Sequence, residues 1–378
     1  MKIGVVGLGY VGSTLAKAAQ LAGHSVVGVE IDSKRIKELS SVGFPVSPDF
    51  NTLSGAEVVV IAVPTPLDSE RKPDLTFLEE ACRSLNPVVG ADTLIVNEST
   101  SYPGTLRNFI KPRVGKAKYF AAAPERVDPG NKKYGIRNTP RLVAGLDIES
   151  SKRAVAFYKT ICDEVVEVSS PEVAEAAKLF ENTFRQVNIA LVNEFAQVAD
   201  KLGISTSETI EAASSKPFGF MPFMASVGVG GHCIPVDPSY LSYVAKELGV
   251  STRFIDIANQ VNLGMPKYLA SRIDSLLGGV KGKRIQIAGL AYKADVADLR
   301  ESPAIALVKE LRGMGAEVTW HDEYVGEWNG EKSAPLKEVD LGVIAAAHSN
   351  VDYGVWKKLG VNVIDVSTGS NLGWPKFL

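Results

Sequence analysis

Cysteine is scarce in this chain, and long hydrophobic runs and an excess of either charge are missing. The 378 residues include 3 cysteines, too few and too scattered for a disulfide framework or a cysteine-rich zinc site. The formal net charge is −2, whereas a nucleic-acid-binding surface needs a basic excess or stripe. The longest apolar runs, such as residues 58–63, are far shorter than the roughly 18 residues of a membrane span. We therefore expect no nucleic-acid partner, no membrane span and no metal site.

The N-terminus also lacks the pattern of a secretory leader, because Met1 opens directly on a strand-like segment without a charged region, apolar stretch and cleavage site. Together with the few cysteines, this predicts a reducing, cytoplasmic setting. The composition, 45% hydrophobic and 22% charged, is that of soluble globular proteins. The length fits between two and three domains of roughly 150 residues each.

Short β-branched runs alternate with helical segments in the first 170 residues. The runs lie at residues 3–6, 25–30, 58–63, 93–97, 119–123, 141–145 and 164–168. Such runs predict βαβ units and a parallel sheet covered on both faces. The same alternation returns after a glycine-rich linker at 278–283. Further strands are expected at 284–289, 316–320, 341–346 and 361–366, and a helix at 303–314.

Between these two α/β segments the hydrophobic period changes to that of a helix. Apolar residues recur at intervals of three and four at Val173, Ala177, Phe180, Phe184, Val187, Leu191, Phe195, Val198 and Leu202. A stripe of this length predicts one long helix, with Pro171 near its start and Gly203 at its end. With further helices expected at 206–215, 238–248 and 252–277, the pattern predicts a helical domain of roughly a hundred residues.

A glycine-rich turn, Gly7-Leu8-Gly9-Tyr10-Val11-Gly12, follows the first predicted strand and precedes an alanine-rich helix. Gly7 would permit the tight turn, Gly9 the approach of a pyrophosphate, and Gly12 close packing of helix on strand. The second strand ends at Glu30, placed to accept hydrogen bonds from both ribose hydroxyls, and a carboxylate there disfavours the 2′-phosphate of NADP. Arg35 can accommodate that phosphate and keeps NADP open. The alternative interpretation is an ordinary strand-to-helix turn.

Two more loops follow predicted strands at the edge where ligands of open α/β sheets bind. They are Val63-Pro64-Thr65-Pro66 and Glu98-Ser99-Thr100. Proline and serine are equally common in plain turns, so the alternative is two turn-forming loops without a ligand.

The most unusual segment is Gly228-Val229-Gly230-Gly231-His232-Cys233-Ile234-Pro235-Val236-Asp237. Its glycines leave backbone accessible to a ligand, and it carries a thiol and a carboxylate four residues apart. A thiolate is a strong nucleophile suited to attack on an aldehyde. The alternative is that a free cysteine is a small buried hydrophobe, which fits the apolar surroundings of Cys82 and Cys162.

Lys178 and Asn182 stand four residues apart on the long predicted helix, so both side chains project from one face. A cation and an amide donor aimed together can stabilise a developing oxyanion. Glu175, Arg185 and Asn193 lie near the same polar side. The alternative is a solvated helix face.

Two loops carry further charged side chains. Pro124-Glu125-Arg126-Val127-Asp128 follows a predicted strand, and a glutamate there can activate water as a general base; the alternative is a charged surface turn. Lys293 and Arg300 lie between a strand end and the helix expected to begin at Pro303, a place suited to phosphate.

Together these segments resemble the nucleotide-sugar 6-dehydrogenases, the UDP-glucose/GDP-mannose dehydrogenase family. The likeness is greatest to the UDP-N-acetylglucosamine and UDP-N-acetylmannosamine 6-dehydrogenases. The motifs stand in the family's order over nearly the whole chain. The resemblance implies an α/β fold with two Rossmann-like domains joined by a central helical dimerisation domain with one long helix. The expected bounds are 1–170 for NAD, 171–278 for the helical domain and 279–378 for the UDP-sugar. It also implies a homodimer and a role in polysaccharide biosynthesis.

The chemistry that the resemblance implies is an NAD-dependent four-electron oxidation of the sugar C6 hydroxyl to the uronic acid. Cys233 would attack the aldehyde, and the thiohemiacetal would then be oxidised to a thioester. Glu125 would act on the water that hydrolyses the thioester. Lys178 and Asn182 would hold the C6 oxygen, and Asp237 would support Lys178 or a water.

Binding residues carry over from the resemblance in the same way. The expected cofactor positions are Gly7, Gly9, Tyr10, Val11, Gly12, Glu30, Arg35, Val63, Pro64, Thr65, Ser99, Thr100 and Arg300. The expected substrate positions are Glu125, Arg126, Lys178, Asn182, Arg185, Phe218, Gly219, Phe220, Gly230 and Lys293.

Segments 181–185, 216–223 and 231–238 resemble the N-acetylhexosamine branch, so UDP-N-acetylglucosamine is favoured. UDP-N-acetylmannosamine, UDP-N-acetylgalactosamine and UDP-glucose follow. Two positions depart from the family: Pro129 stands where many members have a second glutamate, and Ser367 stands where an arginine is common. Two other functions stay open. A two-electron hydroxyacid dehydrogenase needs neither the cysteine nor a third domain, and a non-catalytic NAD-binding regulator would keep the fold alone.

Overall fold

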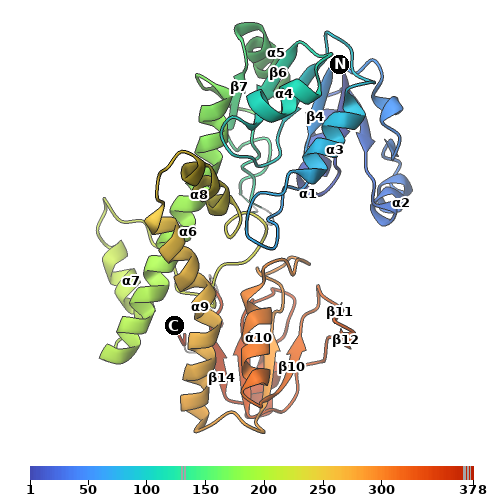
Figure 1. The fold of residues 1–378 in the computed structure, drawn as a ribbon. Helices are drawn as coiled ribbons and strands as arrows, with labels where there is room; N and C mark the ends of the chain where they lie inside the picture. The colour runs from blue at the N-terminus through green and yellow to red at the C-terminus, as the bar shows by residue number, and fades with distance from the viewer. Residues whose placement is uncertain (129–130, 132, 369–371, 373, 375) are drawn as a thin grey trace. The chain divides into compact units, whose positions relative to one another are not determined.

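The structure is a computed structural model that describes residues 1–128, 131, 133–368, 372, 374 and 376–378. The chain folds as two compact units (Figure 1). Unit 1 consists of Met1–Glu181 with Ser239–Val250, and unit 2 of Asn182–Pro238 with Ser251–Leu378. The long helix α6 (Pro171–Leu202) contributes residues to both units. Each unit is described by itself.

Unit 1 is built on an eight-stranded sheet with the order β3-β2-β1-β4-β5-β6-β7-β8. Its strands are β1 (Lys2–Val6), β2 (Ser25–Val29), β3 (Val46–Ser47), β4 (Val58–Ile61), β5 (Leu94–Asn97), β6 (Tyr119–Ala122), β7 (Arg141–Gly145) and β8 (Val165–Glu167). The expectation of a fully parallel sheet was wrong at one place, because β7 pairs antiparallel with β6. An antiparallel neighbour needs no crossover helix, and the described residues between these strands form none.

Both faces of this sheet are buried, which explains why its strands read as nearly continuous apolar runs. On one face Val59, Ile61 and Ile95 pack with Leu78 and Leu85 of α3. On the other face residues of β1, β4 and β5 pack with α1 and α5. The helices of unit 1 are α1 (Tyr10–Leu21), α2 (Ser33–Ser41), α3 (Thr76–Leu85), α4 (Lys111–Arg113), α5 (Ile148–Tyr158) and the short helical turns η1 (Phe50–Leu53) and η2 (Leu106–Ile110).

The long helix α6 begins at Pro171 and ends at Leu202, as the sequence predicts. Gly203 follows it in the left-handed region with φ +69°, and the Ile204 N–H donates to the Ala199 carbonyl at 3.0 Å. This is the arrangement in which glycine ends a helix. Six members of the predicted apolar stripe are exposed, namely Val173, Phe180, Phe184, Leu191, Val198 and Leu202. The stripe therefore does not serve as core within a single chain.

Unit 2 contains a four-stranded parallel sheet with the order β10-β9-β13-β14. The strands are β9 (Arg284–Ala288), β10 (Glu317–His321), β13 (Leu341–Ile344) and β14 (Val363–Asp365), with a small hairpin of β11 (Glu327–Trp328) and β12 (Glu331–Lys332). Helices α7 (Thr206–Ser214), α9 (Arg253–Leu277), α10 (Pro303–Gly313) and α11 (Gly354–Lys358) complete the unit. The predicted strands and helices of this half are confirmed.

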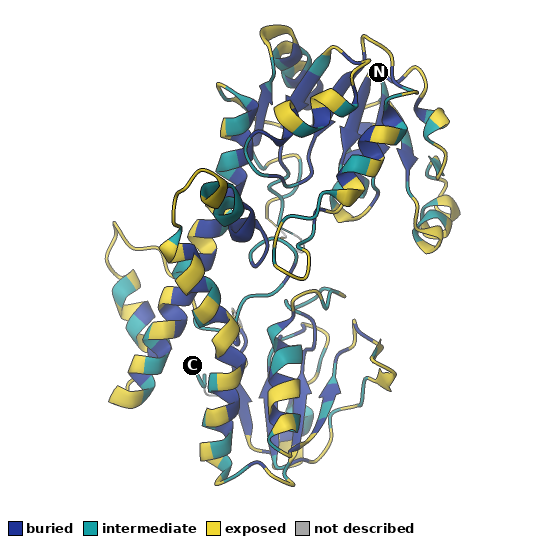
Figure 2. Ribbon diagram, in the orientation of Figure 1, coloured by how far each residue is buried: buried dark blue, intermediate teal, exposed yellow. Residues whose placement is uncertain are grey.

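The strands of the unit 2 sheet are buried, as their dark blue colour in Figure 2 shows, and two hydrophobic clusters pack against the sheet. Leu269 and Ile273 of α9 pack with Leu307 and Leu311 of α10 on one face. Trp356 of α11 lies in a second cluster, with residues of β9, β13 and β14. The helix α8 (Asp237–Glu247) lies almost wholly in unit 1, although it begins in the segment that carries Cys233.

Candidate functional site

The turn after β1 has the geometry of a dinucleotide site. Gly7 has φ +87°, and a Cβ there would lie 2.6 Å from the Ala62 carbonyl oxygen. A Cβ at Gly12 would overlap the Gly7 carbonyl oxygen, so α1 can approach the strand only with glycine at this position. A Cβ at Gly9 would meet nothing within 4 Å, so the backbone there faces open space in which a pyrophosphate fits at the helix N-terminus. Tyr10 and Val11 form the first turn of α1.

Glu30 lies just beyond β2, and its carboxylate accepts a hydrogen bond from the Leu8 N–H at 2.9 Å. Its other oxygen accepts from the Ile31 and Asp32 N–H groups at 2.8 and 3.0 Å. The side chain remains half-buried. Arg35 donates to the Leu8 carbonyl at 2.9 Å and pairs with Glu38 at 3.1 Å. The guanidinium is therefore engaged in holding the turn, while a carboxylate stands just beyond the end of the second strand, an arrangement typical of NAD-binding folds.

The two loops that follow β4 and β5 are joined to each other. The Ser99 hydroxyl donates to the Val63 carbonyl at 2.8 Å, and Thr65 is buried. The Tyr240 hydroxyl of α8 donates to the carbonyls of Thr65 and Pro66 at 3.0 and 3.3 Å. The fold thus brings these predicted cofactor residues to adjacent loops at the carboxyl edge of the sheet, with Pro64 and Thr100 beside them in sequence.

A buried ion pair that the sequence reasoning missed lies next to the Glu125 loop. Arg141 of β7 pairs with Glu98 at 3.3 Å, and both side chains are almost completely buried. Arg141 also donates to the carbonyls of Ala123 and Pro124, which lead into Glu125. Burial raises the pKa of Glu98, against the opposing charge of Arg141. The signal that was available is the position of Glu98 directly after β5.

The Glu125 loop is held by local hydrogen bonds. The Glu125 carboxylate accepts from the Val127 N–H. Arg126, a predicted substrate residue, forms a two-pronged ion pair with Glu181 at 2.6 and 3.1 Å. Arg126 therefore already has a carboxylate partner within unit 1. Pro129, one of the two family departures, lies outside the described residues.

On α6, the interpretation as a plain solvated face was wrong for three residues: Glu175, Lys178 and Asn193 are buried. The Glu175 carboxylate accepts from the Gly104 N–H at 2.7 Å and the Leu106 N–H at 3.0 Å. Burial raises its pKa to about 8, opposed by these two backbone hydrogen bonds. Arg185 is exposed, so that part of the polar side does face solvent.

Asn182 and Asp237 are in direct contact, because the Asn182 amide donates to the Asp237 carboxylate. The Asp237 side chain is buried. Asn193 accepts from the Ser226 N–H at 2.8 Å and donates to Asn262 of α9 at 3.0 Å. Asparagines of α6 thus hold the two ends of the segment that carries Cys233.

The thiol loop is tightly packed within unit 2. The Gly231 N–H donates to the Arg300 carbonyl at 3.0 Å, and Cβ atoms at Gly230 and Gly231 would both lie 2.7 Å from the Tyr292 side chain. Close packing on residues 292–303 therefore demands glycine at both positions. The Cys233 carbonyl accepts from the Val236 and Asp237 N–H groups at 3.1 and 2.8 Å.

The cysteines differ as expected. Cys82 and Cys162 are buried, and Cys233 is half-buried. Burial raises the pKa of Cys82 to about 12, and burial likewise raises the pKa of Cys162. The interpretation as buried hydrophobes is confirmed for these two.

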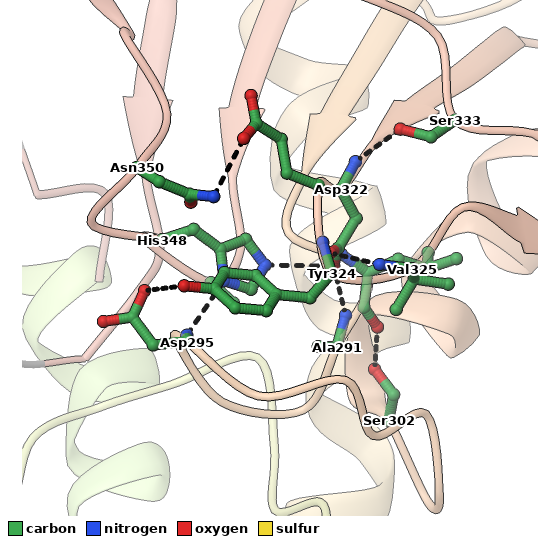
Figure 3. A network of polar contacts seen from close by, with 12 residues as sticks. Ala291, Asp295, Ser302, Asp322, Tyr324, Val325, Ser333, His348 and Asn350 are labelled. Atoms are coloured by element: carbon green, nitrogen blue, oxygen red, sulfur yellow. Dashed lines mark hydrogen bonds and ion pairs between the residues drawn. The ribbon is translucent and has the colours of Figure 1, made fainter. Parts of the chain in front are cut away.

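Lys293 and Arg300 lie in the loop between β9 and α10. Arg300 is exposed and forms a two-pronged pair with Asp298 at 2.6 and 3.1 Å. Burial alone would raise the pKa of Asp298, but the hydrogen bonds from Arg300 outweigh burial, so the pKa of Asp298 is lowered. Asp322 and His348, which the sequence reasoning missed, form a buried pair beside this loop at 3.0 Å (Figure 3). Both follow strands, β10 and β13, and that position was the available signal.

The remaining predicted residues lie elsewhere. Phe218 and Phe220 are exposed, and Gly219 between them has φ +70°. Ser367 donates to the Asp365 carboxylate at 2.6 Å, and Lys376 donates to the same carboxylate and to the Ser367 carbonyl, both at 2.8 Å. A cation, Lys376, therefore lies beside Ser367, the second position that departs from the family.

Comparison with known proteins identifies the family. Models of the UDP-glucose/GDP-mannose dehydrogenase family match the NAD-binding domain at residues 1–53 and 43–162, the central domain at 172–263 and the UDP-binding domain at 286–367. The chain belongs to this family. It is an NAD-dependent nucleotide-sugar 6-dehydrogenase, with an NAD-binding domain and a UDP-binding domain.

Curated relatives cover most of the dehydrogenase. A UDP-N-acetyl-D-mannosamine dehydrogenase from Methanocaldococcus jannaschii is 36% identical over 91% of this chain and 83% of its own length. A UDP-N-acetyl-D-glucosamine 6-dehydrogenase from Pseudomonas aeruginosa is 33% identical over 86% and 83%.

Solved structures of nucleotide-sugar dehydrogenases have the same fold. The UDP-D-ManNAc dehydrogenase of Pyrococcus horikoshii matches with a TM-score of 0.86 and 32% identity, covering 99% of this chain and 98% of that chain. Within the part of the dehydrogenase that the structure describes, no helix combines the length and hydrophobicity needed to cross a bilayer.

Proposed function

We propose that this dehydrogenase oxidises the C6 hydroxyl of a UDP-N-acetylhexosamine to the carboxylate, with a covalent intermediate on Cys233. The observation that carries the proposal is the contrast among the thiols. Two are buried with raised pKa values, whereas Cys233 is half-buried in a glycine loop. Cys233 also stands one turn before α8, because its carbonyl accepts from the Asp237 N–H at 2.8 Å.

Bound NAD⁺ supplies the oxidant, accepting one hydride from C6 in each of two successive oxidations. Between them, the Cys233 sulfur forms a bond to the aldehyde carbon, and the aldehyde oxygen takes a proton. After the second oxidation C6 is a thioester carbonyl. Water then adds to that carbon, the thiolate leaves, and the sugar carries a carboxylate. Overall, one alcohol, one water and two NAD⁺ give one carboxylate, two NADH and three protons.

The other proposed roles follow from residue type and surroundings. Lys178 and Asn182 lie one helical turn apart on α6 and hold the C6 oxygen as charge develops on it. Asp237 fixes the Asn182 amide through their hydrogen bond. Glu125 acts as the base for the hydrolytic water.

Binding roles complete the proposal. The residues around Gly9 and Glu30, with Val63–Thr65 and Ser99–Thr100, receive the cofactor, and Arg300 is assigned to cofactor binding as well. Lys293 contacts the nucleotide, and Arg126, Arg185 and the 218–220 loop contact the sugar side.

The choice of sugar rests on the N-acetylhexosamine-like segments and on the names of the relatives. UDP-N-acetylglucosamine and UDP-N-acetylmannosamine dehydrogenases both stand among those relatives. We place UDP-N-acetylglucosamine first, followed by the mannosamine and galactosamine epimers and by UDP-glucose. A panel of these four substrates, assayed with NAD⁺ and with NADP⁺ at equal concentration, tests the assignment.

The deciding experiment measures how many NADH molecules form for each sugar oxidised. We expect two NADH per uronic acid formed and no free aldehyde, and Cys233→Ser should abolish acid formation while leaving NAD affinity unchanged. One NADH per sugar with a stable carbonyl product would instead identify a two-electron dehydrogenase. Cofactor binding without turnover of any substrate in the panel would identify a regulator.

The dehydrogenase is further proposed to be a homodimer built on α6. At 100° per residue, the six exposed stripe residues from Val173 to Leu202 fall within an arc of about 40°. A narrow apolar stripe along a 32-residue helix suits packing against the same stripe of a second copy. Light scattering should give the dimer mass, and Leu191→Glu should give a monomer; a monomeric wild type would contradict this.

A nucleophilic thiol also suits a reducing, cytoplasmic setting.

We retain three functional domains with bounds 1–170, 171–278 and 279–378. The proposal assigns NAD binding to the first, the catalytic residues of α6, the thiol loop and the dimer interface to the second, and the UDP-sugar to the third. Limited proteolysis near residues 278–283 tests the second boundary.

A further inference from the structure

A buried carboxylate fastens the beginning of the loop that leads from β9 to α10. The N–H groups of Leu290 and Ala291 donate to one oxygen of Asp322 at 2.8 and 2.9 Å. The other oxygen accepts from the Tyr324 and Val325 N–H groups at 2.9 and 3.0 Å (Figure 3). Burial alone would raise the pKa of Asp322, but hydrogen bonds from His348 and Ala291 outweigh it, and the pKa is lowered. The charged carboxylate is therefore well satisfied.

His348 fastens the same loop five residues after its start. Its Nδ1 accepts from the Asp295 N–H at 2.9 Å. Because Nδ1 is an acceptor, Nε2 carries the proton and donates to Asp322 at 3.0 Å. The imidazole ring is buried, and its centroid lies 4.9 Å from the centroid of the Tyr324 ring. One imidazole thus links the loop to the carboxylate through two different nitrogens.

The two anchors flank Lys293 symmetrically, since Ala291 and Asp295 each lie two residues away. Asp295 has φ +60°, a left-handed conformation that a non-glycine residue keeps only when its surroundings hold it. The loop is also closed on itself, because the Tyr292 N–H donates to the Asp298 carbonyl at 3.0 Å. At its base the Ser302 hydroxyl donates to the Leu290 carbonyl at 2.7 Å.

The same loop supports the glycine segment that leads to Cys233. The Arg300 carbonyl accepts from the Gly231 N–H at 3.0 Å. A Cβ at Gly230 would lie 2.7 Å from the Tyr292 Cβ and 2.8 Å from the Glu301 carbonyl. With no spare space between them, a shift of the loop must be accompanied by a shift of the glycine segment.

We propose that His348 and Asp322 are positioning residues for both binding and chemistry. Through Ala291 and Asp295 they hold Lys293 in place for the diphosphate of the nucleotide sugar. Through the rest of the loop they hold the glycine segment and so the Cys233 thiol. This inference rests on the proposed function for the roles of Lys293 and Cys233, and neither positioning residue touches the substrate.

We call the two hydrogen bonds of His348, from the Asp295 N–H to Nδ1 and from Nε2 to Asp322, the clamp. Two substitutions of His348 test these hydrogen bonds separately. In His348→Asn the amide oxygen takes the place of Nδ1 and still accepts from the Asp295 N–H. In His348→Gln the amide nitrogen takes the place of Nε2 and donates to Asp322, but Asp295 loses its acceptor. By calorimetry with UDP as the ligand, we expect H348Q to raise Kd about tenfold and H348N to stay within about twofold of wild type.

The thiol gives a second measurement that needs no substrate. Because the other two cysteines are buried, iodoacetamide should label Cys233 first, and peptide mass spectrometry can follow its rate. We expect H348Q to change that rate at least about threefold and H348N to leave it within about twofold of wild type. Equal melting temperatures and equal NAD affinity in both variants would exclude a general loss of folding.

Wild-type values for H348Q in both measurements, or equal losses in H348N and H348Q, would overturn the inference. If H348Q does not fold, Ser302→Ala takes its place, with an expected rise in the Kd for UDP of about threefold; no change in UDP affinity or labelling would then overturn it. A wild type that fails to bind UDP would refute the proposed role of Lys293, and the labelling rates would still decide the clamp. A wild type that binds UDP but yields one NADH per sugar would refute the chemistry and leave the clamp standing.

Discussion

The two Rossmann-like sheets begin in the same way and use the resulting geometry differently. Each first strand runs into a left-handed glycine, Gly7 at φ +87° and Gly289 at φ +85°. Each glycine N–H donates to the strand beside it, at 2.9 and 2.8 Å. In each case the next residue donates to a carboxylate after that neighbouring strand, Glu30 in unit 1 and Asp322 in unit 2.

The difference lies in what the carboxylate can still do. Glu30 is half-buried beside open space at Gly9, so it can serve a ribose. Asp322 is buried, and both of its carboxylate oxygens accept hydrogen bonds from backbone N–H groups, one of them also from His348. The same strand–glycine–acid arrangement therefore leaves its carboxylate accessible in unit 1 and uses it to fix a loop in unit 2.

The largest effect is expected from adding one methyl group to these turns. In Gly289→Ala the Cβ would overlap the backbone of Ala346, so we expect a loss of roughly 4 kcal/mol in the free energy of unfolding or failure to fold. Gly9→Ala is the matched control, since its Cβ meets nothing within 4 Å. It should change stability by less than about 1 kcal/mol and weaken NAD binding at least about tenfold. Equal stability of the two variants in thermal unfolding would contradict the different packing of the two glycines.

An intermediate effect should separate the two acids by ligand. Glu30→Gln removes the charge that we propose receives the ribose, so the Kd for NAD should rise about tenfold with UDP affinity unchanged. Asp322→Asn should do the reverse, with weaker UDP binding and unchanged NAD binding. Calorimetry with each ligand on each variant measures all four values. A loss of NAD affinity in Asp322→Asn equal to that in Glu30→Gln would contradict the division of roles.

A change of pH should affect stability through Glu175 but not through Asp322, because the two buried carboxyl groups have pKa values shifted in opposite directions. Burial raises the pKa of Glu175 from 4.5 to about 8 in the folded state, against backbone hydrogen bonds that lower it. Between those values the folded state holds a proton that the unfolded state has lost, so stability must fall as pH rises and level off above about 8. Asp322 has a lowered pKa, so its contribution is complete throughout this range and is lost only in acid.

The variant Glu175→Gln removes this titration. The melting temperature of wild type relative to the variant should fall by a few degrees, about 2–5 °C, between pH 6 and pH 8. Asp322→Asn should show no such relative slope over the same interval. A wild-type curve parallel to that of Glu175→Gln would show that the carboxyl is already ionised at pH 6.

The sequence predicted most of this fold because its signals are local. β-branched runs gave the strands, a period of 3.6 gave α6, and Pro171 and Gly203 marked its ends. The antiparallel β7 was missed because strand direction depends on the path of the segment between strands, which carries no periodic signal. The small hairpin around Gly330 was missed because two-residue strands leave no alternation to detect.

The sequence predicted the geometry of the first turn, where Gly7 and Gly12 leave no room for a Cβ, and it predicted that Cys82 and Cys162 are buried. Partners that meet only in the fold could not be read. Arg141 and Glu98 are 43 positions apart in sequence. Asn182 and Asp237 are also widely separated. The exposure of the α6 stripe was likewise invisible, because periodicity locates an apolar face without telling whether the same chain covers it.

Trapping the proposed thioester on Cys233 would test the proposed mechanism directly. In Glu125→Gln the thioester should form but hydrolyse slowly. Mixing this variant with UDP-N-acetylglucosamine and NAD⁺ should give a burst of two NADH per subunit and, after acid quenching, a sugar adduct on the Cys233 peptide by mass spectrometry. No adduct, together with one NADH per sugar released as a carbonyl product, would contradict the account.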